Sequence, residues 1–158
     1  MADDLQIITG TKEEQYETLL PQISALLYGE KDLVANLANV AAALKEQFGW
    51  LWVGFYLVKE DELVLGPFQG PVACTRIKKG RGVCGKAWAD AETLIVEDVE
   101  KFPGHIACSS LSKSEIVVPI IWDNNVVAVL DVDSQTKSNF ETTQKKYLKK
   151  LISQINFI

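Results

Sequence analysis

Three cysteines are the residues of this chain whose type and spacing most clearly suggest chemistry. Cys74, Cys84 and Cys108 lie 10 and 24 residues apart in a chain that has a single histidine. This spacing differs from the short cysteine pairs of zinc ribbons, and one histidine cannot complete a Cys/His cage, so we expect no metal site. In a reducing compartment, disulfides that form are usually transient and catalytic. The three thiols therefore indicate redox chemistry, although a single free cysteine is more often a small buried apolar residue.

Two aspartates at the end of an apolar segment form a second candidate site. Asp131 and Asp133 close the run VVAVLDVD (126–133), whose two faces are both apolar, as is typical of an interior strand. Their carboxylates project from one face, roughly 6.6 Å apart along the strand. Removing two like charges from water is costly unless a cation or hydrogen-bond donors meet them. We favour a ligand ammonium group over the alternative, in which one carboxylate caps a turn and the other pairs with a lysine.

An aromatic pair in another expected strand offers an apolar wall. Trp52 and Tyr56 point to the same face of the strand, with Gly54 between them. At a rise of ~3.3 Å per residue, the two rings should stand about 13 Å apart with an empty slot between them. A glycine inside a strand often marks the close approach of a ligand, but it can equally admit a neighbouring core side chain. From this strand alone, both interpretations stay open.

A glycine-rich segment, GRGVCG (80–85), leads into a short expected helix. Its glycine spacing matches a dinucleotide-binding fingerprint, but the chain lacks the alternating strand and helix pattern that this fingerprint needs. The position of Cys84 near a helix N-terminus predicts a lowered thiol pKa, because the helix dipole favours the thiolate. His105, three residues before Cys108, is expected to be a surface residue without a catalytic role.

Helical periodicity marks both ends of the chain. Two helices are expected at about 11–48, the first opening at a capping box on Thr11 and interrupted or kinked at Pro21. A C-terminal helix is expected at about 138–156, opening at a second capping box on Ser138.

The middle of the chain changes to the two-residue period of strands. A sheet core is expected over about 50–134, with a long irregular segment at 98–113 that is typical of a functional loop. Expected strands lie at 50–58, 62–66, 73–78, 93–97, 115–122 and 126–133. The order of elements predicts a single α+β domain, 1–158, in which helices pack on an antiparallel sheet.

Composition narrows the classes of function. With 158 residues and 47% hydrophobic content, one domain can bury a full core. The net charge of −5 and the pI near 4.9 give no sign of the basic face that nucleic-acid binding needs. Apolar runs are shorter than a bilayer span, and the start MADDLQ has no leader-like pattern. We expect a cytoplasmic protein that binds neither nucleic acid nor membrane.

The chain resembles the free methionine-(R)-sulfoxide reductases, which are stand-alone GAF-domain enzymes. Five segments carry the resemblance: LLPQISALLYGEKDLVANLANVAAAL, GWLWVGFYLV, GPFQGPVACTRIKKGRGVCGKAW, FPGHIACSSLSKSEIVVPI and VLDVDS. The resemblance implies a GAF-like α+β fold and reduction of free L-methionine-(R)-sulfoxide to L-methionine. It further implies thioredoxin as the electron donor and no cofactor. By analogy with other GAF domains, a homodimer formed through the terminal helices is compatible with the sequence.

The resemblance also implies roles for the three cysteines. Cys108 is expected to be the nucleophile, Cys74 the preferred resolving partner, and Cys84 an alternative or assisting thiol. The sequence does not decide between Cys108 and Cys84 as the nucleophile. Attack on the sulfoxide releases methionine and leaves a sulfenic acid, which condenses with a second thiol to a disulfide that thioredoxin reopens.

The resemblance assigns the polar and aromatic residues to the substrate pocket. Glu115, Asp131 and Asp133 match an acidic pocket, in which one protonated carboxyl meets the sulfoxide oxygen and others hold the ammonium group. Trp52 and Tyr56 match its aromatic wall. Two alternatives differ in class: a GAF sensor module that binds a small ligand without turning it over, and a thiol switch with no small substrate.

Overall fold

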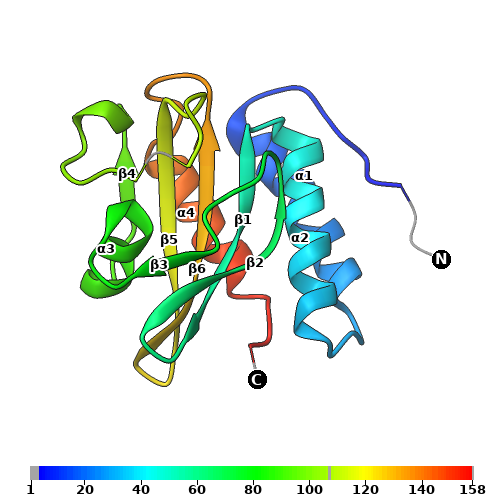
Figure 1. Ribbon diagram of the computed structural model, residues 1–158. Helices are drawn as coiled ribbons and strands as arrows, with labels where there is room; N and C mark the ends of the chain where they lie inside the picture. The colour runs from blue at the N-terminus through cyan, green and yellow to red at the C-terminus, as the bar shows by residue number, and fades with distance from the viewer. Residues whose placement is uncertain (1–3, 107, 158) are drawn as a thin grey trace.

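The computed structural model describes residues 4–106 and 108–157, and a six-stranded sheet forms its centre (Figure 1). The strand order is β3-β2-β1-β6-β5-β4, and every pair of neighbours is antiparallel. The strands are β1 (Trp52–Lys59), β2 (Glu62–Gln69), β3 (Arg76–Lys78), β4 (Leu94–Val96), β5 (Ser114–Trp122) and β6 (Asn125–Ser134). The prediction of an antiparallel sheet with helices packed on it is confirmed.

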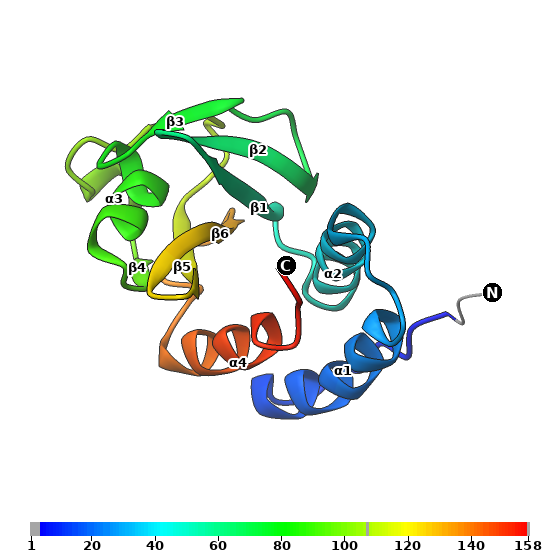
Figure 2. The ribbon, with the colours of Figure 1, turned by 90° about the horizontal axis from the view of Figure 1, so that it is seen from below.

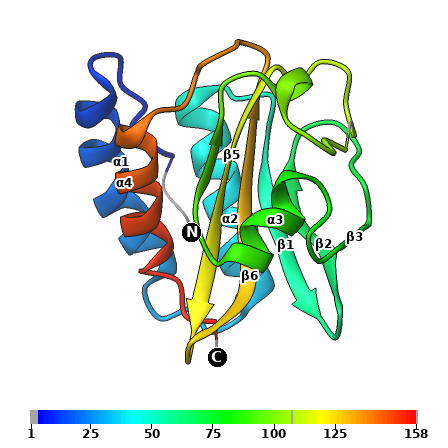
Figure 3. The same cartoon turned by 90° about the vertical axis from the view of Figure 1, so that its left-hand side faces the viewer.

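The two faces of the curled sheet carry different helices (Figure 2). One face is covered by α1 (Lys12–Leu27), α2 (Leu33–Phe48) and α4 (Thr142–Ile152), which bury the larger apolar core against it. On the other face lie α3 (Gly82–Asp90) and the segment with the short 3₁₀ helix η1 (Val99–Lys101), as Figure 3 shows from the side. No helix among the described residues is both long enough and apolar enough to span a bilayer.

The N-terminal helices begin and end where capping chemistry places them. The side chain of Thr11 accepts from the backbone of Glu14 in the predicted capping box, and α2 is capped by Asp32. Gly49 ends α2 with a φ of 64°, which favours glycine. The expected interruption at Pro21 is wrong, because α1 continues through it. Proline removes one backbone donor, and the buried apolar face of α1 holds the helix across it.

The C-terminal helix starts later than the sequence indicates. Ser138 has a φ of 55°, outside the helical region, and it precedes the helix. Glu141 is the true N-cap: its side chain accepts from the backbone of Gln144, whose side chain accepts from the backbone of Glu141 in return. The same capping pattern therefore occurs three residues further along, and α4 runs from Thr142 to Ile152 rather than over 138–156.

Strand register brings the candidate polar residues together. Asp133 on the interior strand β6 lies opposite Trp52 of β1 and opposite Glu115 of β5. Residues directly opposite in antiparallel strands point to the same face, so these three side chains form one row across the sheet. In the next row on that face, Asp131 lies opposite Gly54. The prediction that VVAVLDVD is an interior strand is confirmed.

Candidate active site

A cavity of about 50 Å³ lies against the face of the sheet that carries α3. It is bounded by the sheet, by the start of α3, by the segment between β2 and β3, and by the loop before β5. Seven of the predicted site residues line it: Trp52, Tyr56, Cys84, Cys108, Glu115, Asp131 and Asp133. Side chains that are far apart in the sequence thus meet at one cavity.

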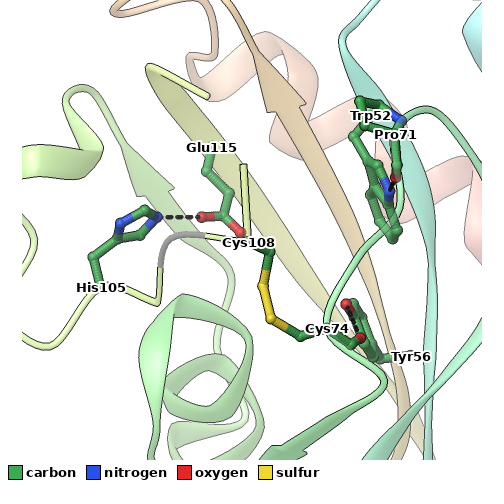
Figure 4. Close-up of a disulfide and its surroundings, with 7 residues drawn as sticks. All are labelled: Trp52, Tyr56, Pro71, Cys74, His105, Cys108 and Glu115. Carbon is green, nitrogen blue, oxygen red and sulfur yellow. Dashed lines mark hydrogen bonds and ion pairs between the residues drawn. A yellow bond between two sulfur atoms is a disulfide. The ribbon is translucent and has the colours of Figure 1, made fainter. Parts of the chain in front are cut away.

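The eighth predicted residue, Cys74, joins this group through a disulfide to Cys108 (Figure 4). The two Cα atoms are 5.8 Å apart, although the residues are separated by 34 positions in the chain. The bond ties the segment before β3 to the loop before β5 at the edge of the cavity. The sequence favoured Cys74 as the partner of Cys108, and the structure pairs them.

Cys84 is the free thiol of the site, and it is buried in the first turn of α3. The expectation that its pKa is lowered is wrong. Burial raises the pKa of this thiol well above its ordinary value, and the negative charges of Asp131, Glu115 and Asp133 raise it further. The helix N-terminus is therefore outweighed by desolvation and by the carboxylates that face it.

The three carboxyl groups of the cavity share an apolar environment. Glu115 and Asp131 are 5% and 7% exposed. Burial is the main cause that raises the pKa of Glu115 and of Asp133 well above the ordinary carboxyl range, and the charge of Asp131 adds to both. Burial also raises the pKa of Asp131, although hydrogen bonding with Glu115 and Cys84 opposes the rise. Protonated carboxyls are therefore favoured here, as expected for clustered acids.

The hydrogen bonding of the two aspartates differs. Ser112 Oγ donates to Asp133 Oδ1 at 2.9 Å. Asp131 Oδ1 is buried and has no hydrogen-bond partner among the described residues. Neither aspartate forms an ion pair within residues 4–106 and 108–157, so the alternative of a lysine partner is wrong. Asp131, which lines the cavity, therefore has one buried acceptor that is unsatisfied.

His105 is a site residue that the sequence analysis did not identify. It lines the cavity, its side chain is 16% exposed, and its Nε2 lies 4.0 Å from Glu115 Oε2 (Figure 4). Burial lowers the pKa of its imidazole. The expected surface position is wrong, because the loop before β5 folds back over the sheet. Its place three residues before Cys108 was the available signal.

The aromatic wall is more compact than the strand spacing suggests. The ring centroids of Trp52 and Tyr56 are 5.9 Å apart, so the expected 13 Å slot does not exist. A Cβ on Gly54 would lie 2.3 Å from Cβ of Phe68 and 2.8 Å from Trp52. The glycine therefore admits neighbouring side chains, which was the second of the two interpretations. Strand rise separates Cα atoms, whereas long side chains lean along the strand.

Hydrogen bonds at the rim fix both aromatic rings (Figure 4). Trp52 Nε1 donates to the carbonyl of Pro71 at 3.0 Å, and the Tyr56 hydroxyl donates to the carbonyl of Cys74 at 2.8 Å. Burial raises the pKa of Tyr56, so its hydroxyl stays a donor. Both bonds reach the segment before β3, and the bond from Tyr56 anchors Cys74, which carries one half of the disulfide.

Comparison with known proteins places this site in a family. Residues 32–157 match the GAF domain family. Over 145 residues the chain is 46% identical to the free methionine-R-sulfoxide reductase of Escherichia coli (strain K12), covering 91% of this chain and 88% of that protein. This chain belongs to the free methionine-R-sulfoxide reductase family of GAF-domain proteins.

Other members of the GAF family align over nearly their whole length. GAF domain-containing protein A of Dictyostelium discoideum is 64% identical over 157 residues, which is 99% of each chain. The free methionine-R-sulfoxide reductase of Neisseria meningitidis, solved in complex with its substrate, superimposes with a TM-score of 0.95 at 54% identity. That match covers 98% of this chain and 93% of the other. The resemblance stated from the sequence is thus confirmed at the level of family and fold.

Proposed function

We propose that this protein reduces free L-methionine-(R)-sulfoxide to L-methionine, with its own thiols as the immediate reductant. The observation that carries the proposal is the meeting of three carboxyls, two of them buried, with a disulfide-forming cysteine pair at one cavity. A carboxyl cluster suits a substrate with an ammonium group and a polar sulfoxide, and the thiols supply two electrons. The named reductases of this family, including one solved with its substrate, support the same activity.

Substrate recognition follows from the charges and surfaces of the cavity. The unpartnered Oδ1 of Asp131 accepts a hydrogen bond from the substrate ammonium, whose charge compensates the buried carboxylate. A methionine inside a peptide has no ammonium at this position, so the site selects the free amino acid. Trp52 offers an apolar ring face to the ε-methyl group of the substrate. Glu115 or Asp133, kept protonated by burial, donates to the sulfoxide oxygen.

The reaction takes three balanced steps. A cysteine sulfur attacks the sulfoxide sulfur, and the oxygen passes to the cysteine, which leaves the thioether of methionine and a cysteine sulfenic acid. A second thiol displaces water from the sulfenic acid and forms a disulfide. Two electrons and two protons from an external dithiol then restore both thiols. In this scheme the protonated carboxyl assists by donating toward the sulfoxide oxygen as its bond to sulfur weakens.

Cys108 is the better nucleophile of the two candidates, and Cys74 resolves it. The disulfide joins these two residues, whereas Cys84 stays free and buried. Thiolate is the reactive form, and burial among carboxyls disfavours it at Cys84. Cys108 lies in an exposed part of its loop, which also lets an external dithiol reach the disulfide. We assign that role to thioredoxin, acting in a reducing compartment such as the cytoplasm.

The test is to supply the reduced protein with separated epimers of free methionine sulfoxide, with dithiothreitol as the reductant, and to quantify methionine. The proposal predicts methionine from the R epimer only, and none from a peptide-bound sulfoxide. Thioredoxin with its reductase should replace dithiothreitol. If neither epimer yields methionine while the thiols are confirmed to be reduced, the protein is a ligand-binding GAF module rather than a reductase.

A further inference from the structure

We propose that Cys84, Glu115 and Asp131 form a binding site for a thiophilic divalent cation, with Zn²⁺ as the preferred ion. One sulfur and one carboxylate oxygen from each acid all lie within 4.8 Å of one another. The three residues come from α3, β5 and β6. The spacing of cysteine and histidine along the chain predicts no metal site, because such spacing does not reveal ligands that come from three different elements.

The donor atoms lie at most 4.8 Å apart, which is close enough for small side-chain shifts to form a zinc site. Metal–ligand distances of about 2.0–2.3 Å place neighbouring ligand atoms about 3.3–3.7 Å apart. Side-chain shifts of about 1 Å would bring the three donor atoms from their present separations to these values. Three protein ligands are sufficient, because zinc sites commonly complete their coordination with a water molecule.

Burial and an unsatisfied acceptor distinguish this cluster from an ordinary acidic patch. All three side chains are at least nine-tenths buried, with Cys84 at 5% exposure. Asp131 Oδ1 has no hydrogen-bond partner among the described residues, and Asp131 lines the cavity. Surface carboxylates gain little from a cation, whereas a buried carboxylate with one oxygen left without a hydrogen bond gains compensation of its charge.

The chemistry of the donors selects the ion. A thiolate is a soft ligand that Zn²⁺ accepts readily, whereas Mg²⁺ and Ca²⁺ prefer oxygen ligands alone. On binding, the thiol of Cys84 and any carboxyl of the pair that holds a proton release their protons to solvent, and the cation supplies the positive charge in their place. His105, whose Nε2 is 4.0 Å from Glu115 Oε2, is placed to orient that carboxylate.

Metal binding and substrate binding would exclude one another at this site. Asp131 and Glu115 are the carboxyls that the proposed function assigns to the substrate, so an ion between them would block it. This consequence rests on the proposed function, but the binding of the metal does not.

The experiment titrates metal-free, oxidised protein with Co²⁺, which reports a sulfur ligand by a charge-transfer absorption in the near ultraviolet. With the disulfide closed, Cys84 is the only free thiol of the chain. The proposal predicts one equivalent of bound Co²⁺ with this absorption, and its loss on adding one equivalent of Zn²⁺. Zn²⁺ should also raise the melting temperature of the wild type.

Three variants make the result decisive. Cys84→Ala, a small substitution that a core tolerates, should abolish the charge-transfer absorption and the thermal shift. Asp131→Asn should weaken Co²⁺ binding at least tenfold. A Cys74→Ser/Cys108→Ser double variant, in which Cys84 is again the only thiol but no disulfide covers the cavity, should keep the absorption.

Three results would overturn the proposal. One is the absence of the absorption from both the oxidised wild type and the double variant, and another is its persistence in Cys84→Ala. The third is unchanged affinity in Asp131→Asn. Because no substrate is used, none of these results depends on whether the protein is a reductase.

Discussion

The two faces of the sheet differ in the kinds of side chain that they bury. The face under α1, α2 and α4 is an apolar core, whose largest fully buried side chains include Leu19, Leu37 and Leu148. The face under α3 also has an apolar cluster, but three carboxyls, two of them buried, and a buried thiol lie within it. Burial is used for packing on one face and to shift pKa values on the other.

The difference shows where the fold gives up stability for chemistry. Burial and the charges of the neighbouring carboxyls favour the protonated form of these acids. The carboxyls add nothing to hydrophobic stabilisation, and each costs desolvation when it is charged. Such costs are typical of functional sites. Substitutions on the face under α1, α2 and α4 (the helical face) should therefore lower stability alone. Substitutions of the polar groups on the face under α3 (the site face) should lower activity alone.

The largest effect is expected at the nucleophile. Cys108→Ser should reduce methionine formation to the uncatalysed background, because a serine hydroxyl cannot take the oxygen of the sulfoxide and form a disulfide. The measurement is methionine release from the R epimer with dithiothreitol. The matched control is Ser110→Ala, an exposed position of the same loop that does not line the cavity, which should keep full activity. An active Cys108→Ser variant would move the nucleophile to Cys84.

The next effect separates activity from stability on the site face. Asp131→Asn keeps the size of the side chain but removes the charge that meets the substrate ammonium. Loss of a charge-assisted hydrogen bond is worth about 1.5–3 kcal/mol, so kcat/KM should fall about 10- to 100-fold. The free energy of unfolding in urea should stay equal or rise, because a desolvated acid is replaced by a neutral amide. Parallel losses of kcat/KM and stability would instead make Asp131 a structural residue.

The helical face should give the opposite pattern. Leu44 is fully buried on α2, and Leu44→Ala should lower the free energy of unfolding by about 2–5 kcal/mol. Below the unfolding transition, kcat/KM per folded molecule should match the wild type, because α2 does not line the cavity. A drop in kcat/KM without a loss of stability would show that the two faces are coupled.

The smallest effect is a pH dependence of stability that arises on the site face. The pKa of Asp133 is well above its ordinary value of 3.8, so the folded protein holds this proton more tightly than the unfolded chain does. Its contribution to stability is complete below pH 3.8 and is lost as the pH rises through the folded pKa. Above pH 3.8, the free energy of unfolding should therefore fall more with rising pH for the wild type than for Asp133→Asn.

Other groups also titrate over this pH range, so the test is the difference in unfolding free energy between the wild type and Asp133→Asn. The pKa of His105 is lowered by burial, and its contribution is lost as the pH falls below its ordinary value of 6.5. Because both proteins contain His105, its contribution largely cancels when their unfolding free energies are subtracted. The difference then reports Asp133 together with its effect on the pKa of Glu115. Equal slopes for the wild type and Asp133→Asn would contradict the raised pKa.

Features fixed by local chemistry were predictable from the sequence. The helix over 33–48 has a capping aspartate, an apolar stripe and a terminal glycine, and the structure places it there. The meeting of Asp131 and Asp133 with Glu115 followed from strand alternation and from the family resemblance, and the register confirms it. Capping boxes are less specific, because the box at Ser138 predicted a helix start that the structure places at Glu141.

Features that depend on burial in the folded chain were not predictable. The helix N-terminus predicted a low pKa for Cys84, but the pKa is raised because carboxylates from β5 and β6 pack against α3. His105 was expected at the surface, but its loop folds over the cavity. The ring distance between Trp52 and Tyr56 depended on side-chain orientation, which strand periodicity does not give. For Cys84 and His105 the deciding neighbours lie far away in the sequence.

The most direct test of the account is a single turnover without external reductant. Reduced protein is mixed with one equivalent of free methionine-R-sulfoxide, quenched with an alkylating reagent, and analysed for methionine and for the state of each cysteine by mass spectrometry. The account predicts one methionine per chain, a Cys74–Cys108 disulfide and alkylated Cys84. A disulfide that contains Cys84, or no methionine from fully reduced protein, would contradict it.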